Sequence, residues 1–304
     1  MRVFRAAGGR VMALGFAPGG RFLVAAHQRH GVFACDMASD APPDRIAPYQ
    51  RVRGQDIRFA GDGPTALWLN TGRATGFDFG KRSLVTLGFK KEITLWGFDI
   101  SSDGTRLVTS SGPYSDSRLT VWRSDPELGW AEVWWKPNGR TWGNASLSAA
   151  GDMVAHLSVT PRRPHQYLYS LIVRDAATGE EAGVGRYPYS YISPLAFRPD
   201  GGQIVCAHET RILAWGLPGL DPPKVVANDS RLHFTAAAYD PTGRYLFTTS
   251  NDATVVVWDT ESWERVRRFT WKIGRLRSVA VSGDGAQAAA GSEKGEVVVW
   301  DVDE

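Results

Sequence analysis

The sequence predicts an all-β protein made of seven repeated sheet units, and three observations carry this prediction. Apolar residues alternate or form short runs rich in Val, Leu and aromatic residues, and clusters of Gly, Asp, Asn and Pro separate these runs. Turn glycines recur every 41 to 50 residues, at positions 20, 63, 104, 151, 201, 243 and 285. A single hairpin cannot bury its apolar face, so the copies must pack on one another.

The repeat consists of a short apolar strand, a turn with Gly, a second apolar run and a β-branched run that ends in Trp. Its clearest copies are residues 236–260 (AAAYDPTGRYLFTTSNDATVVVWDT) and 278–302 (SVAVSGDGAQAAAGSEKGEVVVWDV). The glycine supplies the positive φ that a tight hairpin favours. Seven copies fill the chain, so we expect one domain over residues 1–304. Its expected repeats span about 7–47, 48–89, 90–136, 137–186, 187–228, 229–270 and 271–304.

The composition excludes several classes of protein. A hydrophobic fraction of 43% with 11% aromatic residues excludes a disordered chain. No apolar run approaches the roughly 18 residues that a membrane-spanning helix needs. Two cysteines exclude a disulfide scaffold, and a net charge of +3 is far below that of a protein that coats nucleic acid. The early run VMALGFA recurs as a repeat element and is bounded by Arg10, so we expect a cytoplasmic protein without a secretion signal.

The repeats resemble those of the WD40 family. Trp258-Asp259 and Trp300-Asp301 match the signature dipeptide of that family, and the resemblance spans nearly the whole chain. It implies a complete seven-bladed β-propeller of four-stranded antiparallel sheets; a count of six or eight requires that one weak copy be misread. In the other copies the slot of the dipeptide holds Trp122, Trp215, Cys35-Asp36, Phe77-Asp78 and Arg174-Asp175.

The two ends of the chain are complementary. The last copy ends at Val302 and contains inner strands but no outer strand, whereas residues 1–6 precede the first copy and contain Val3 and Phe4. We therefore expect residues 1–6 to pair with the C-terminal blade, which closes the ring and covers an open sheet edge. This complementarity also predicts a complete domain rather than a fragment.

The resemblance implies that the repeat tryptophans pack between neighbouring blades. In the family a His, a Ser or Thr, an Asp and this Trp form a buried hydrogen-bonded set. Asp252 and Asp116 match the Asp, but the Gly-His pair is absent. We therefore expect these blades to rely on apolar packing.

Catalytic motifs are missing from the sequence. It contains no G-x-S-x-G elbow, no phosphate-binding G-x-x-x-x-G-K-[ST] loop and no H-E-x-x-H. His27 and His30 fall at a strand-to-turn junction, where solvent-facing turn residues are favoured over metal ligands, and Cys206 is interpreted as a buried inert thiol. We expect no catalytic residue, no metal and no cofactor. The alternative is a propeller enzyme, lactonase-like or lyase-like, that acts at the central channel.

Binding residues are expected on the narrow face. The resemblance places there the loops that enter each inner strand and the loops between second and third strands. Ring closure makes the blades of Arg10, Arg53, Arg275 and Arg277 neighbours, and other loops of this face add Lys294, Arg29 and Arg73. We hypothesise that this rim binds an acidic or phosphorylated segment; the alternative is a merely solvated rim. The candidate partner-binding residues are Arg10, Arg53, Trp96, Tyr191, His233, Arg275, Arg277, Arg162 and Arg163.

Asp56, Arg58 and Asp99 are the candidate residues of the channel, where the other inner-strand positions are small. An ion-paired cluster in a water-filled channel is favoured over a catalytic set. Residues 264–277 interleave cations with aromatic residues, but an exposed outer strand explains them better than nucleic-acid binding does. The sequence thus favours a monomeric, non-catalytic scaffold that binds a protein or peptide, with neither nucleic acid nor membrane as partner.

Overall fold

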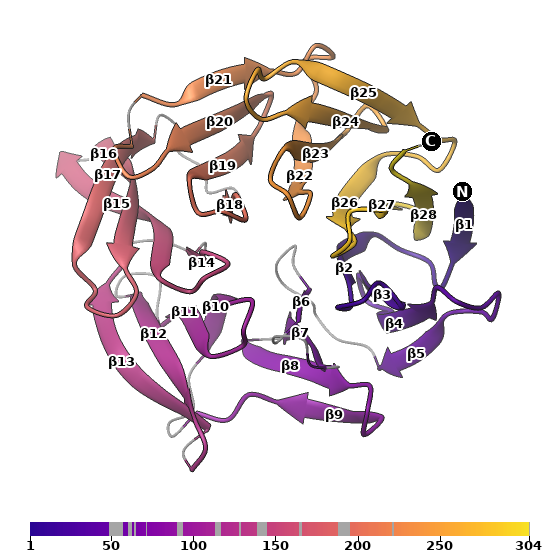
Figure 1. Cartoon of the computed structure of the whole chain (residues 1–304), viewed down its shortest axis with the longest axis horizontal. Helices are drawn as coiled ribbons and strands as arrows, with labels where there is room; N and C mark the ends of the chain where they lie inside the picture. Colours follow the sequence, from indigo (N-terminus) through magenta and orange to yellow (C-terminus); the bar gives the residue numbers. More distant parts are fainter. Residues whose placement is uncertain are drawn as a thin grey trace.

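The chain forms a ring of seven four-stranded antiparallel sheets around a central channel (Figure 1). The computed structural model describes residues 1–48, 57–59, 63, 65–70, 72–89, 94–112, 117–127, 129–138, 145–163, 166–187, 195–220 and 222–303. Among these residues there is no helix that is long and apolar enough to cross a membrane. The predicted all-β fold and its seven blades are confirmed.

Each of the first four blades runs outward from its inner strand in sequence order. Blade 1 contains β2 (Val11–Phe16), β3 (Phe22–His27), β4 (Gly31–Asp36) and β5 (Asp44–Ala47). Blade 2 contains β6 (Arg58–Phe59), β7 (Thr65–Asn70), β8 (Arg73–Asp78) and β9 (Ser83–Thr86). Blade 3 contains β10 (Leu95–Ile100), β11 (Arg106–Ser111), β12 (Arg118–Asp125) and β13 (Gly129–Pro137). Blade 4 contains β14 (Ala145–Leu147), β15 (Met153–Arg163), β16 (Gln166–Asp175) and β17 (Glu181–Tyr187).

Blades 5 and 6 follow the same order, and blade 7 combines both ends of the chain. Blade 5 contains β18 (Leu195–Phe197), β19 (Gln203–His208), β20 (Arg211–Gly216) and β21 (Lys224–Ala227). Blade 6 contains β22 (Phe234–Tyr239), β23 (Tyr245–Ser250), β24 (Thr254–Asp259) and β25 (Arg265–Thr270). Blade 7 contains β26 (Leu276–Val281), β27 (Gln287–Ser292), β28 (Glu296–Asp301) and, outermost, β1 (Arg2–Arg5).

Strand β1 closes the ring by pairing antiparallel with β28, so Arg2 lies opposite Val299 and Arg5 opposite Glu296. The two termini therefore lie side by side in Figure 1. Phe4 packs on the apolar cluster between blades 7 and 1, and the Arg2 guanidinium donates to the carbonyl oxygen of Ser39 at 2.7 Å. The predicted closure by the N-terminal strand is confirmed.

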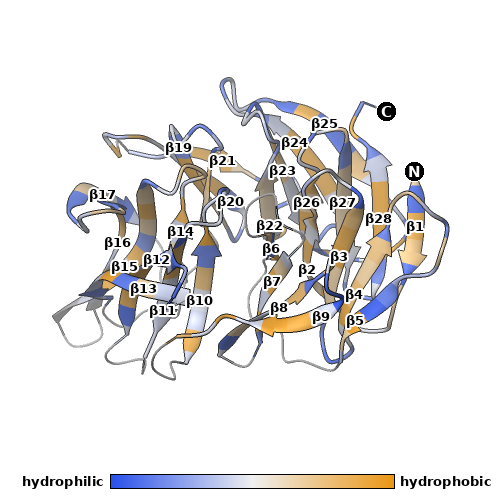
Figure 2. Ribbon diagram, turned by 60° about the horizontal axis from the view of Figure 1, so that its bottom comes forward, coloured by the Kyte–Doolittle hydropathy of each residue, from blue (hydrophilic) through white to orange (hydrophobic). Residues whose placement is uncertain are grey.

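The hydrophobic core is divided among the blade interfaces. The described residues form seven buried apolar clusters, and each cluster joins two neighbouring blades. Figure 2 shows the corresponding hydrophobic colour along the strands and hydrophilic colour in many of the connecting loops. Because each blade is covered by its two neighbours, apolar burial stabilises the ring only when all seven blades are in place.

The repeat tryptophans lie in these interfaces, and two of them are hydrogen-bonded. The Nε1–H of Trp122 donates to the Thr109 hydroxyl at 2.8 Å, and that of Trp258 donates to the Thr248 hydroxyl at 2.9 Å. In both blades the threonine stands two residues beyond the cross-strand partner of the tryptophan, so both side chains share one face of the sheet. The expectation of apolar packing alone is therefore wrong for blades 3 and 6.

Blade 4 uses a polar chain in place of a tryptophan. Arg174 occupies the tryptophan slot, and its Nε–H donates to Nε2 of the buried His156 at 3.3 Å. The other ring nitrogen, Nδ1, lies 2.7 Å from the Asn138 amide oxygen, which accepts its proton. Burial, aided by the charge of Arg174, lowers the pKa of His156 to about 3. The ring is therefore neutral in the folded protein.

His27 is a second buried imidazole. It ends strand β3 and has no exposed surface, so its interpretation as a solvent-facing turn residue was wrong. The apolar run of this strand ends at Ala26, so the sequence pattern alone does not include His27 in the strand. The pKa of His27 is lowered to about 4, mainly by burial, with the Gly8 backbone raising it and the nearby His30 lowering it. In mild acid His27 and His156 stay neutral in the folded protein, whereas the same histidines take up a proton in the unfolded chain.

We predict that removal of Arg2–Arg5 behind Met1 lowers the melting temperature by at least about 5 °C, because it uncovers β28 and the apolar cluster beneath Phe4. The measurement is thermal unfolding followed by circular dichroism. The matched control is Val3→Ser, since Val3 is 49% exposed on the outer side of the same strand and should matter little. An unchanged melting temperature in the truncated protein would contradict a closing role for β1.

We also predict that the free energy of unfolding falls as the pH is lowered from 7 to 5. Histidine has a pKa near 6.5 in the unfolded chain, so over this range the unfolded chain takes up protons that folded His27 and His156 refuse. The expected loss at pH 5 is about 2 kcal/mol per buried imidazole. Urea unfolding at the two pH values measures it. The free energy of unfolding of His156→Gln should fall less than that of the parent. An equal fall would show that His156 does not contribute to the pH dependence.

Candidate functional site

The narrow face of blades 7 and 1 brings residues from the two ends of the chain together. Arg10 directly precedes inner strand β2, and Arg275 directly precedes inner strand β26. Their carbonyl oxygens accept hydrogen bonds from the Gln28 and Glu293 backbone N–H groups, both at 2.8 Å. The Ser278 hydroxyl donates to the Val11 carbonyl oxygen at 3.0 Å and so links the two inner strands.

Four exposed cations stand on this part of the face without an ion pair to any other described residue, and we call them the cationic edge. Cations elsewhere are commonly neutralised: Arg21 pairs with Asp36 at 3.2 Å and Arg198 with Asp200 at 2.8 Å. The edge thus carries positive charge that its own surroundings do not offset. Its members are Arg10, Arg29, Arg275 and Lys294.

Arg277, a predicted rim residue, is not free in the same way. It sits at a β-bulge of β26, between Leu276 and Ser278, and its Nη2 donates to the Glu293 carboxylate at 3.1 Å. The arginine and glutamate side chains are 24% and 29% exposed. Arg277 therefore stands beside the cationic edge as half of an ion pair with the loop of its own blade, not as a free positive charge.

Trp96, a predicted aromatic anchor, is held in a similar way. It lies at the bulge between Leu95 and Gly97, half-buried, and its Nε1–H donates to the Gly112 carbonyl oxygen at 2.5 Å. In blade 6 the equivalent Thr235 hydroxyl lies 2.9 Å from that of Thr249. A bulge re-aims its side chain, and here it turns each side chain onto the end of the second strand or the following loop.

The remaining predicted rim residues are less defined. His233 is exposed just before β22. Arg162 and Arg163 belong to β15, but their side chains lie outside the described set. Arg53 and Tyr191, together with Asp56 of the channel, lie outside the described residues. Their proposed roles remain predictions.

The turns of the wide face carry many carboxylates, a feature that we did not predict from the sequence. Its turns join first to second strands and third to fourth strands, and repeated Asp-Gly pairs are the signal that could have revealed it. The hydroxyls of Ser101 and Ser282 hold the pKa values of Asp103 and Asp284 below the usual range, so these groups stay charged. Carboxylates of the described wide-face turns include Asp36, Asp40, Asp103, Glu127, Asp152, Asp175, Glu180, Asp200, Asp259, Glu261, Asp284 and Asp303.

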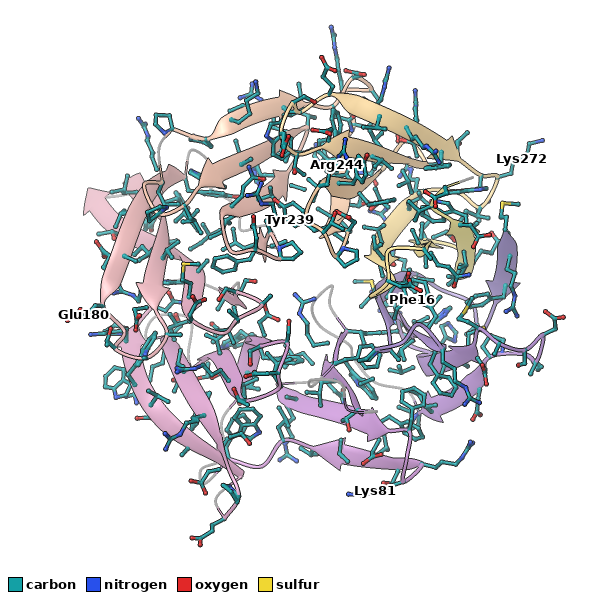
Figure 3. The ribbon with its side chains drawn as sticks, in the orientation of Figure 1. Phe16, Lys81, Glu180, Tyr239, Arg244 and Lys272 are labelled. Atoms are coloured by element: carbon teal, nitrogen blue, oxygen red, sulfur yellow. The ribbon has the colours of Figure 1, made fainter. Side chains whose placement is uncertain are left out.

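The central channel contains a cavity of about 520 Å³ lined by the inner strands. Phe16 and Tyr239 lie beside it, while Lys81, Glu180 and Lys272 extend from the outer rim (Figure 3). Arg58, Asp99 and Ser146 occupy the same inner-strand position in blades 2, 3 and 4. In blades 1, 5, 6 and 7 that position holds Gly15, Ala196, Ala238 and Ala280.

Asp99 links three blades. Its buried carboxylate accepts hydrogen bonds from the Arg58 Nε at 2.5 Å, the Ser146 hydroxyl at 2.8 Å and the Leu147 backbone N–H at 3.0 Å. The backbone N–H of Ile100 donates to it as well. Both oxygens are therefore fully engaged, and Asp99 is the one carboxylate among the described residues that line the cavity. This arrangement joins the inner strands of blades 2, 3 and 4, and the described residues that line the cavity include no second carboxylate and no histidine.

Metal-ligating side chains do not gather in the described part of the chain. There, no three His, Cys, Asp or Glu side chains lie close enough together to hold a metal ion. Cys35 and Cys206 are both buried and form no disulfide, and burial raises the pKa of the Cys35 thiol.

We predict that Asp99→Ala lowers the free energy of unfolding by roughly 3 kcal/mol, and that Arg58→Ala costs less. Loss of the carboxylate leaves the buried Ser146 hydroxyl and the Leu147 N–H without their acceptor, whereas loss of Arg58 leaves the Ser146, Leu147 and Ile100 donors to the carboxylate in place. Urea unfolding at pH 7 measures both variants. A larger cost for Arg58→Ala would show that Asp99 is not the centre of this contact.

Comparison with known proteins adds a family to this geometry. The family model of the WD domain, G-beta repeat (WD40), matches residues 228–259 and 263–301, which contain most of blades 6 and 7. Human transducin beta-like protein 2 is 24% identical over 314 residues, covering 93% of this chain and 62% of that protein. Pre-mRNA-processing factor 19 homolog 2 of Arabidopsis thaliana is 33% identical over 78 residues, covering 25% of this chain and 15% of that protein.

The chain therefore spans less than two thirds of the length of either relative. The matched repeats are the two that carry the complete Trp-Asp dipeptide, Trp258-Asp259 and Trp300-Asp301. The other five blades reach the same four-stranded form with divergent residues in that slot. Two of the seven blades thus carry repeats that the WD40 model matches, and all seven blades have the four-stranded form of the propeller that such repeats build.

Proposed function

We propose that this propeller is a non-catalytic scaffold that binds an acidic or phosphorylated segment of a protein partner on the cationic edge. Proteins with WD40 repeats generally act as protein-interaction scaffolds, which supports the general class. The observation that carries the finer proposal is the group of four exposed cations, Arg10, Arg29, Arg275 and Lys294, without ion pairs among the described residues. Carboxylate and phosphate groups bind such side chains through charge-assisted hydrogen bonds.

The carboxylates in the turns of the wide face add a second argument. An anionic segment is repelled by the carboxylates of the wide face and attracted to the cationic edge, so the field of the whole molecule orients its approach. The edge also stands on a rigid base, because its loops are bonded to inner strands by the backbone contacts of Arg10 and Arg275. A rigid surface loses little conformational entropy on binding.

An enzyme that acts in the channel has less support. Such a reading needs convergent acid–base or metal-binding groups, and the described lining offers one carboxylate, that of Asp99, with its oxygens already in hydrogen bonds. The cavity walls are otherwise largely Ala, Val, Leu and Phe. The proposed scaffold role therefore rests on the rim rather than on the axis.

We predict that the double charge reversal Arg10→Glu/Arg275→Glu weakens binding of an acidic peptide at least about tenfold, because each site changes from attraction to repulsion. The probes are fluorescein-labelled synthetic peptides with four Asp or four phosphoserine residues among Gly and Ser. Fluorescence anisotropy at several salt concentrations gives the affinity. Binding to the parent should weaken as salt is added.

The matched control is Arg123→Glu/Lys224→Glu. Both residues are exposed on strands of the outer wall, and the double variant changes the net charge by the same amount. It should retain most of the binding. If the two double variants bind the peptides equally well, the cationic edge is not the binding surface.

A further inference from the structure

Glu293 is a carboxylate placed among the cations of blade 7 on this face. It is the first residue after β27, and Lys294 follows it directly. Its backbone N–H donates to the Arg275 carbonyl oxygen at 2.8 Å, and its carboxylate accepts from Arg277 at 3.1 Å. The same short loop therefore presents one anion and one cation beside the two arginines of β26 and its approach.

The loop that carries Glu293 is held in place. The Ser292 hydroxyl accepts hydrogen bonds from the backbone N–H groups of Lys294 at 3.2 Å and Glu296 at 3.1 Å. Gly295 has a φ of 89°, and a side chain there would collide with the carbonyl oxygen of Ala7. Glu293 thus stays next to Arg277, and this tether gives its carboxylate a high effective concentration at the guanidinium.

The pair is nevertheless an incomplete one. It uses a single donor, Nη2, and the buried Nε–H of Arg277 has no hydrogen-bond partner among the described residues. Bidentate arginine–carboxylate pairs are stronger than this arrangement. Both side chains are also about a quarter exposed, which weakens the attraction through solvent screening. A contact of this kind can be broken by a competing anion.

We propose that Glu293 is a built-in competitor at the cationic edge: its carboxylate occupies Arg277 until an anionic group of the partner displaces it. The inference rests on the proposed function and names a residue that sets its selectivity. No covalent change is involved, since one ion pair is exchanged for another. The released Glu293 side chain has solvent within reach, and Arg277 then joins Arg275 and Lys294 as a third cation for the partner.

This exchange favours one class of anion over another. A single carboxylate from the partner replaces a carboxylate that is already tethered, so it gains little. A phosphoryl group carries nearly two charges and three acceptor oxygens, and it can bond to more than one cation at once. Glu293 therefore discriminates against isolated Asp or Glu side chains and in favour of a phosphorylated one.

The test is Glu293→Gln, which keeps the size of the side chain and removes its charge. With the labelled peptides described above, its affinity for the four-Asp peptide should rise by about fivefold, and its affinity for the phosphoserine peptide should rise less. Glu261→Gln is the control, because it makes the same change in net charge at a wide-face turn. That variant should leave both affinities within about twofold of the parent.

Two further outcomes separate this inference from the proposed function. If Arg10→Glu/Arg275→Glu abolishes binding but Glu293→Gln behaves like Glu261→Gln, the competitor role is wrong and the binding surface stands. If neither Arg10→Glu/Arg275→Glu nor Glu293→Gln changes the affinity for the peptides, both proposals are wrong. A peptide-free readout is the ¹⁵N shift of the Arg277 Nε–H during titration with inorganic phosphate, which should respond at lower phosphate in Glu293→Gln than in the parent.

Discussion

The pairing of β1 with β28 is the contact on which the rest of the structure depends. Arg2–Arg5 gives blade 7 its outer strand, and this brings the first and last blades into contact. Each apolar cluster needs both of its blades, so an open ring would leave two blade faces in water. A four-residue strand thus controls the burial of far larger surfaces, because it converts a linear series of repeats into a closed one.

Within that ring, the blades meet the same packing requirement with different chemistry. Trp122 and Trp258 bond to threonines, Trp300 packs on the Trp271 ring at 4.7 Å, and Arg174 forms a polar chain through His156. Each solution fills the space beside the preceding or following blade without an unpaired charge. The strict dipeptide of the family is therefore one of several ways to hold a blade, which explains why only two repeats match the family model.

The sequence could predict the ring because its period, turn glycines and complementary ends all depend on local patterns. It predicted Arg10 and Arg275 as neighbours because closure alone places β2 beside β26. It could not predict that Trp96 and Arg277 turn onto their own loops, since a β-bulge shifts the register without a mark in the alternation of residues. The burial of His27 was not predicted for a similar reason: His27 is the last residue of β3, and in the sequence such a residue has the same pattern as the first residue of a turn.

The position of the cationic edge follows from the closure of the ring. Arg10 and Arg29 belong to blade 1, whereas Arg275 and Lys294 belong to blade 7, and these two blades meet where the ring closes. Like charges on one side of the ring repel one another, and carboxylates held by serine hydroxyls lie in turns of the wide face. Glu293 reduces the repulsion within blade 7 by neutralising Arg277. In the complex that we propose, an anionic group of the partner relieves the remainder, so the same charges that repel one another in the free protein attract the partner.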